Sequence, residues 1–217
     1  MEYELNEGIA VLHFDDGKVN AIGFDFMKAI REGLASADRE AKAVVVAGRA
    51  GILSGGFDLK EFRKGPEATN AMMAEASPMF HRLFSLPQPL IVACTGHAVA
   101  AGALLLLVAD NRIGSAGDFK IALNETSIGF SFPVFGIELA RARLDPAYLT
   151  RSFVQSEVFG PDEAVRAGFF DRVVPPEEVL DAALEKARQL AELPREAYAK
   201  NKRDIRSLAL GAIEASL

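Results

Sequence analysis

The side chain in this sequence best suited to chemistry is a single glutamate, Glu125, in the segment 121–129. It follows a glycine- and alanine-rich stretch at 96–102, which leads directly into an apolar run at 103–109. A positioned carboxylate can accept a proton and return it, which is general acid–base chemistry. One carboxylate suffices to move a proton, whereas adding water across a double bond is normally served by two. The lone glutamate therefore favours proton transfer.

Two glycine-rich segments, at 53–60 and 98–102, each stand just before an expected helix. Backbone N–H groups at such junctions lack partners within the helix, and the helix dipole makes them attractive to negative charge. Two such donors aimed at one oxygen form an oxyanion hole, and each is typically worth roughly 3 kcal/mol in the transition state. Taken alone, either segment is a weak signal, because tight packing of a helix against a strand explains such a segment more often than an oxyanion hole does.

The remaining candidate groups show no pattern that predicts a second kind of chemistry. His13, His81 and His97 have no mutual spacing that suggests a metal site or a catalytic triad, so no metal is expected. Ser54 has no base near it in the sequence and is not interpreted as a nucleophile. Cys94 lies in an apolar run, where a cysteine behaves as a small hydrophobic residue.

Hydrophobic patterning predicts the elements that must position these residues. Continuous apolar runs indicate buried strands at 9–14, 43–48 and 90–95, and two further short strands are expected at 111–114 and 119–121. Phe26, Ile30 and Leu34 recur at helical spacing, and Asp58 is expected to cap a short helix. Further helices are expected at 71–86, 133–143, 146–153, 161–167, 176–191 and 195–215.

Length and composition limit the classes of protein that the chain can belong to. Half of the 217 residues are apolar, which is enough for one large domain. With 24 basic and 30 acidic residues the net charge is −6, which argues against nucleic acid as a partner. The run at 98–109 falls short of the about 20 residues that span a bilayer. A cytoplasmic protein without a membrane partner is expected, since one cysteine indicates a reducing compartment.

The order of these segments resembles the crotonase family, the enoyl-CoA hydratase/isomerase superfamily, over nearly the whole chain. The motifs that carry the resemblance are Val19-Asn20-Ala21, residues 54–61, 96–102 and 109–113, and Asn124-Glu125 followed by Ile128-Gly129. The resemblance implies an α/β fold with a crotonase-type ββα spiral core at about 1–130. A helical C-terminal portion at about 131–217 would complete a single domain over 1–217.

Members of that family bind acyl-CoA thioesters and stabilise the enolate at the thioester carbonyl with two backbone N–H groups. By motif, these would belong to Phe57 and Ala101, and no cofactor beyond the coenzyme A of the substrate is implied. The family's hydratases use two glutamates; here Leu104 occupies the first position and Glu125 keeps the second. This pattern is most similar to the monofunctional Δ3,Δ2-enoyl-CoA isomerases, with a single shuttling base whose pKa is raised by apolar surroundings.

Apolar residues around these positions are expected to form the wall of an acyl pocket: Leu104, Phe132 and Phe135. Two alternatives to an isomerase remain open. One is an enoyl-CoA hydratase that recruits a second carboxylate, for which the candidates are Glu61, Glu67 and Glu75. The other is a non-catalytic acyl-CoA binding protein.

The resemblance also implies a homotrimer or a dimer of trimers. The last predicted helix carries three large apolar residues, Leu208, Leu210 and Ile213, with little sequence after them to cover them. They are interpreted either as an oligomer contact or as docking of the helix on its own core.

Overall fold

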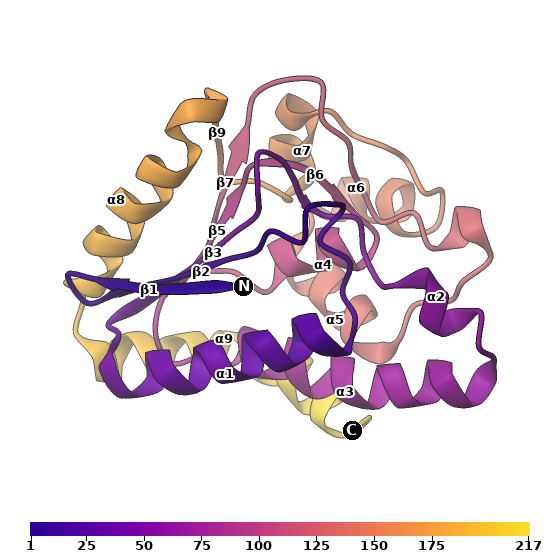
Figure 1. Cartoon of the computed structure of the whole chain (residues 1–217), viewed down its shortest axis with the longest axis horizontal. Helices are drawn as coiled ribbons and strands as arrows, with labels where there is room; N and C mark the ends of the chain where they lie inside the picture. Colours follow the sequence, from indigo (N-terminus) through magenta and orange to yellow (C-terminus); the bar gives the residue numbers. More distant parts are fainter.

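A computed structural model describes all 217 residues, which form two β-sheets surrounded by nine α-helices (Figure 1). The larger sheet has the strand order β1-β2-β3-β5-β7-β9; only β1 runs antiparallel to its neighbour. Its strands are β1 (Glu2–Asn6), β2 (Ile9–His13), β3 (Ala43–Ala47), β5 (Leu90–Cys94), β7 (Asn111–Ser115) and β9 (Arg172–Val174). A smaller parallel sheet contains β4 (Gly51–Ser54), β6 (Gly96–Val99) and β8 (Ile121–Ala122).

Most of the helices begin where the sequence offers a capping group or a proline; the exceptions are α1, α4 and α8. Asp58 accepts a hydrogen bond from the backbone N–H of Lys60 at the start of α2, and Asp145 caps α6 in the same way. The helices are α1 (Phe24–Glu40), α2 (Leu59–Phe62), α3 (Pro66–Phe84), α4 (Ala101–Leu107), α5 (Val134–Arg143), α6 (Pro146–Phe153), α7 (Pro161–Ala167), α8 (Val179–Ala191) and α9 (Arg195–Glu214). Short 3-10 helices occur at Thr126–Ile128 and Pro176–Glu178. None of the helices is both long and apolar enough to cross a bilayer.

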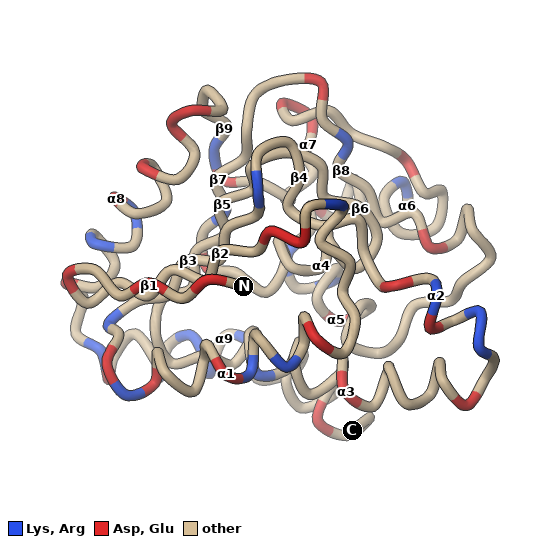
Figure 2. The backbone as a smooth tube through the Cα atoms, in the orientation of Figure 1, with Lys and Arg blue, Asp and Glu red and all other residues tan.

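The larger sheet is covered on both faces, which explains why its inner strands are continuous apolar runs. Helix α8 packs on one face, where Val179, Ala183 and Ala187 share a buried cluster with alternate residues of β2, β3 and β5. The opposite residues of the same strands join a much larger core under α1, α3 and α4 (Figure 1). Charged residues occur along the outer helices and loops, and β3 and β5 carry none (Figure 2).

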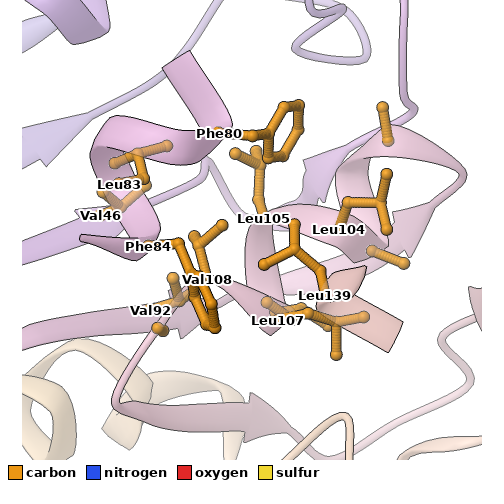
Figure 3. Packing of buried hydrophobic residues seen from close by; sticks show 14 of the residues in the cluster. Val46, Phe80, Leu83, Phe84, Val92, Leu104, Leu105, Leu107, Val108 and Leu139 are labelled. Carbon is orange, nitrogen blue, oxygen red and sulfur yellow. The ribbon is translucent and has the colours of Figure 1, made fainter. Parts of the chain in front are cut away.

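Helix α4 is buried along its whole length and lies at the centre of this core. Figure 3 shows Leu104, Leu105 and Leu107 of α4 among side chains from α3, α5 and the sheet. A helix that is hydrophobic all round is stable only when it is enclosed on every side. The apolar run at 103–109 therefore lies mostly in a core helix. Ala101, the first residue of that helix, is held in place by the packing of α4.

The structure confirms the α/β fold and most of the elements expected from patterning. Differences arise where the apolar pattern is weak: β1, β4, β6 and β9 were not predicted. β1 is mostly exposed, β4 and β6 have four residues and begin with a glycine, and β9 has three residues. The C-terminal portion is not purely helical, because β9 returns to the larger sheet beside β7. The helix expected at 176–191 is divided into a 3-10 turn and α8.

The last helix docks on its own core through some of its apolar residues and exposes others. Leu210 and Ile213 are buried, whereas Leu208 is 90% exposed and Ile205 is 87% exposed. Leu210 and Ile213 therefore dock the helix on its own core, whereas the side chain of Leu208 is left exposed.

A buried cluster of charges joins α9 to the amino-terminal ends of β5 and β7. The carboxylate of Asp110 accepts hydrogen bonds from the backbone N–H of Leu90 at 2.8 Å, from Lys202 Nζ at 2.5 Å and from Arg206 Nη2 at 2.8 Å. The three charged side chains are each less than a tenth exposed. Because all three partners are buried, loss of one leaves the others uncompensated.

Replacing Asp110 with alanine is expected to lower the free energy of unfolding by about 3–5 kcal/mol, since two buried cations lose their shared carboxylate. The change is measured by urea denaturation of the purified protein. Asp204→Ala is the matched control, because Asp204 pairs with Lys200 on the exposed face of the same helix and should change stability little. Equal losses in the two variants would contradict the structural role of Asp110.

Candidate active site

A mostly apolar cavity of about 190 Å³ lies between α2, α3, α4 and the loop that follows β8. Its wall includes Phe57, Leu104 and Glu125, and Glu125 is its only titratable side chain. Small-molecule sites are typically apolar cavities with a few polar groups, as here. A larger hollow of about 530 Å³ beside α1 is lined by five carboxylates, Asp15, Asp16, Asp25, Asp58 and Glu61, and lacks that character.

Glu125 is held immediately before the 3-10 helix Thr126–Ile128. Its backbone carbonyl accepts hydrogen bonds from the N–H groups of Ile128 and Phe130, and Gly129 ends the turn with φ +80°. The carboxylate is 8% exposed, and its Oε2 has no hydrogen-bond partner among the protein's groups. Burial raises the pKa of Glu125 from 4.5 to about 7. A carboxyl group with this pKa can both accept and return a proton near neutral pH.

The backbone N–H groups of Phe57 and Ala101 donate to no acceptor in the protein. Ala101 is the first residue of α4, where a helix leaves N–H groups unpaired. It follows Ala100, which lines the cavity and adopts φ +53°, a strained conformation for a residue with a side chain. This conformation of Ala100 turns the chain sharply from β6 into α4 and fixes the direction of the Ala101 N–H.

Gly56 brings the two donor segments into contact. It has φ +95°, and a Cβ at this position would lie 2.9 Å from the Cβ of Ala100 and 3.3 Å from the backbone nitrogen of Ala101. Only glycine allows both the backbone conformation and this close approach. The two unpaired N–H groups therefore come from adjacent backbones, as an oxyanion hole requires.

Ser54 and Asn20 hold the first donor segment in place. The Ser54 hydroxyl donates to the carbonyl oxygen of Asn20 at 2.7 Å and accepts from the backbone N–H of Gly56 at 3.1 Å. The buried Asn20 amide donates to the carbonyl oxygens of Phe14 and Leu53. The sequence did not indicate a nucleophile at Ser54, and no other role was predicted for it. The glycines that follow Ser54 indicate a tight turn, which is where a serine hydroxyl commonly binds the backbone.

The structure brings together four of the six residues predicted for the site. Phe57, Leu104 and Glu125 line the cavity, and Ala101 directly follows a lining residue. Phe132 and Phe135 do not line it. Phe135 is fully buried and stacks on Phe80 at 4.7 Å between ring centroids, and Phe132 stacks on Phe153 at 3.7 Å. Both rings therefore pack against other aromatic rings of the fold instead of lining the cavity.

Several apolar lining residues were missed, among them Phe62, Met73 and Phe130. The rings of Phe62 and Phe130 approach to 5.0 Å across segments far apart in the sequence. Their local patterns do not distinguish a cavity-facing side chain from a core-facing one, so the sequence carried no signal for them. Asn124 also lines the cavity, and its Oδ1 is buried without a hydrogen-bond partner in the protein.

The three glutamates considered as a second carboxylate lie outside this wall. Glu61 pairs with Lys64 at 2.7 Å, and Glu75 pairs with Arg31 at 2.9 Å on the surface. Glu67 is exposed in the first turn of α3. No group of three or more His, Cys, Asp or Glu side chains is arranged to hold a metal ion.

A buried carboxylate in an apolar cavity, with unpaired backbone N–H groups on the lining residue Phe57 and on Ala101 beside the lining residue Ala100, defines a class of enzyme. Its members move a proton on a substrate whose developing oxyanion the N–H groups stabilise. The comparison with known families agrees with this class: the family model described as enoyl-CoA hydratase/isomerase matches residues 4–210, and the chain belongs to that family. It is thus a crotonase-type enzyme that processes acyl-CoA thioesters.

Relatives in this family carry both activities in their names. The chain is 33% identical over 204 residues to a probable enoyl-CoA hydratase of Mycobacterium avium, which covers 90% of this chain and 77% of that protein. A structure of an enoyl-CoA hydratase/isomerase family protein from Pseudomonas syringae is 45% identical with a TM-score of 0.96, covering 99% of this chain and 93% of that one. The human mitochondrial Δ3-Δ2-enoyl-CoA isomerase is 26% identical with a TM-score of 0.94, covering 99% and 86%.

Glu125→Gln is expected to stabilise the protein above pH 7. The folded-state pKa is raised, so the native protein holds the proton more tightly than the unfolded chain and loses stability as the pH rises from 4.5 to about 7. The loss amounts to roughly 3 kcal/mol, because one pKa unit corresponds to about 1.4 kcal/mol. Glutamine carries no charge and escapes this loss.

The free energy of unfolding of both proteins is measured across this pH range by denaturant titration. The advantage of the glutamine variant should shrink as the pH falls toward 4.5. A constant difference at every pH would show that the carboxylate has an ordinary pKa in the folded state.

Proposed function

We propose that this protein is a Δ3,Δ2-enoyl-CoA isomerase in which Glu125 is the only acid–base group. The observation that carries the proposal is that Glu125 is the single titratable side chain lining the cavity, with unpaired N–H donors on the lining residue Phe57 and on the adjacent Ala101. The position that carries another glutamate in the family's hydratases is occupied by Leu104, which is fully buried in the cavity wall.

In this mechanism the thioester carbonyl oxygen of a 3-enoyl-CoA binds between the N–H groups of Phe57 and Ala101. The ionised Glu125 removes a proton from C2, and the electrons move into the carbonyl to give a dienolate whose oxyanion the two donors stabilise. Glu125 then delivers the same proton to C4, the 2,3 double bond forms, and the carboxylate is restored. Leu104 presents no group that could activate water for addition.

An enoyl-CoA hydratase is the second candidate, because one of the relatives bears that name. It requires a second carboxylate near C3 of the substrate, and Glu61, Glu67 and Glu75 would each have to move to supply one. A non-catalytic acyl-CoA binding protein would use the same cavity and donors without turnover.

The native protein is expected to convert 3-enoyl-CoA to 2-enoyl-CoA and to leave 2-enoyl-CoA without added water. Glu125→Gln should reduce kcat by about 10²–10⁴-fold while acyl-CoA binding is retained, since only the proton carrier is lost. Double-bond position and hydration are followed by NMR and mass spectrometry in deuterated water. The matched control is Glu61→Gln, which changes a carboxylate outside the cavity and should leave turnover unaffected.

The pH dependence supplies a further check on the same base. The kcat/KM of the native enzyme should rise with pH through about 7 and then level off, because Glu125 must be ionised to accept the C2 proton. Formation of a 3-hydroxyacyl product would favour the hydratase, and binding without turnover of either thioester would favour the binding protein.

We also propose that the protein forms a homotrimer, or a dimer of trimers, in the cytoplasm. Ile205 and Leu208, both exposed and about one turn apart on α9, support a contact between copies, since apolar side chains that lie together on a surface mark such contacts. Leu208→Ser is expected to shift the mass measured by light scattering toward the monomer. Leu217→Ser, which changes an exposed leucine at the chain end, is the control. A monomeric native protein would contradict this assembly.

A further inference from the structure

A basic groove runs along the amino-terminal edge of the larger sheet, under the start of α9. It consists of two hollows of about 460 and 290 Å³ that share Leu193 and Tyr198. Neither hollow shares a lining residue with the cavity around Glu125. Its charged residues are five cations and one carboxylate: Lys42, Arg143, Arg195, Lys202, Arg206 and Asp110.

This concentration of positive charge contrasts with the rest of the chain, whose net charge is −6. Helix α9 forms one wall of the groove and carries the basic residues Arg195, Lys200, Lys202, Arg203 and Arg206. The first turn of α9 also borders both hollows through Tyr198. Unpaired N–H groups in this turn add partial positive charge at the same place.

The buried charges beneath the groove do not balance. Asp110 accepts from Lys202 and Arg206, and Asp171 accepts from Arg112 at 2.7 and 2.9 Å. These two carboxylates face four cations, because Arg143 lies in the same cluster without a carboxylate partner. The cluster therefore retains an excess of two positive charges.

Arg143 is the least satisfied member of the cluster. Its Nη2 donates to the carbonyl oxygen of Ala109 at 2.9 Å, while its buried Nε has no acceptor in the protein. Burial, together with the neighbouring Arg112 and Arg206, lowers the pKa of the Arg143 guanidinium to about 10. A buried charge in this position is costly unless an anion or a hydrogen-bond acceptor compensates it.

We propose that this groove binds a phosphate group, with Arg143, Lys202 and Arg206 as its charged floor and Lys42 and Arg195 at its rim. A phosphate monoester carries about −1.5 to −2 charges at neutral pH, which matches the excess charge of the cluster. Arginine suits this role, because its planar guanidinium binds phosphate oxygens in a forked geometry. The site is independent of the reaction proposed above.

The test is isothermal titration of the whole protein with inorganic phosphate, with chloride adjusted to keep the ionic strength constant. The native protein should bind phosphate, and Arg143→Gln should weaken binding at least about tenfold through loss of a charge-assisted contact. Arg141→Gln is the matched control, since Arg141 lies on the same helix, pairs with Glu138 at 2.9 Å and is absent from the groove. Its affinity should equal that of the native protein.

Arg143 is partly buried, so a second variant guards against a folding defect. The double substitution Lys42→Gln and Arg195→Gln changes two exposed side chains at the rim and should also weaken phosphate binding. Acetate, with one charge, should bind more weakly than phosphate at the same ionic strength. The proposal is overturned if the native protein binds no phosphate, if all variants bind it equally, or if acetate binds as tightly.

Discussion

The site depends on how closely two stretches of backbone approach each other between β4 and α4. A Cβ on Gly102 would lie 2.2 Å from the carbonyl oxygen of Ser54, and one on Gly96 would lie 2.0 Å from the carbonyl carbon of Gly51. Neither position can hold a larger residue without moving the backbone. Because main chain touches main chain here, the donor groups are positioned by the fold itself rather than by flexible side chains.

The same packing explains how a cavity with few polar groups can still stabilise an oxyanion. Its wall is mostly hydrocarbon, so the few polar groups act in a medium that screens charge weakly. Weak screening strengthens the attraction of the N–H pair for an oxyanion and also raises the pKa of Glu125. The apolar wall thus strengthens the interaction on which the proposed reaction depends, and it also destabilises the ionised form of Glu125.

The sequence predicted the parts of this protein that repeat or that carry a motif. Long apolar runs predicted β2, β3 and β5, and the glycine-rich segments together with the resemblance predicted where Phe57, Ala101 and Glu125 would lie. It did not predict β4 and β6, because strands of four residues containing glycine have too little periodicity. Nor could the sequence distinguish the aromatic rings that face the cavity from those that face the core. Which way a ring faces depends on how helices far apart in the sequence pack together.

The link between Asp110 and α9 has a consequence for how the protein is made. The residues of the proposed site are all contained in the first 130 or so positions, whereas Lys202 and Arg206 are close to the carboxyl end. While the chain is being synthesised, Asp110 cannot meet its cationic partners until the last helix leaves the ribosome. We expect the core at the amino-terminal ends of β5 and β7 to stay uncovered until then, so a nascent chain that already contains the whole catalytic segment is not yet fully packed.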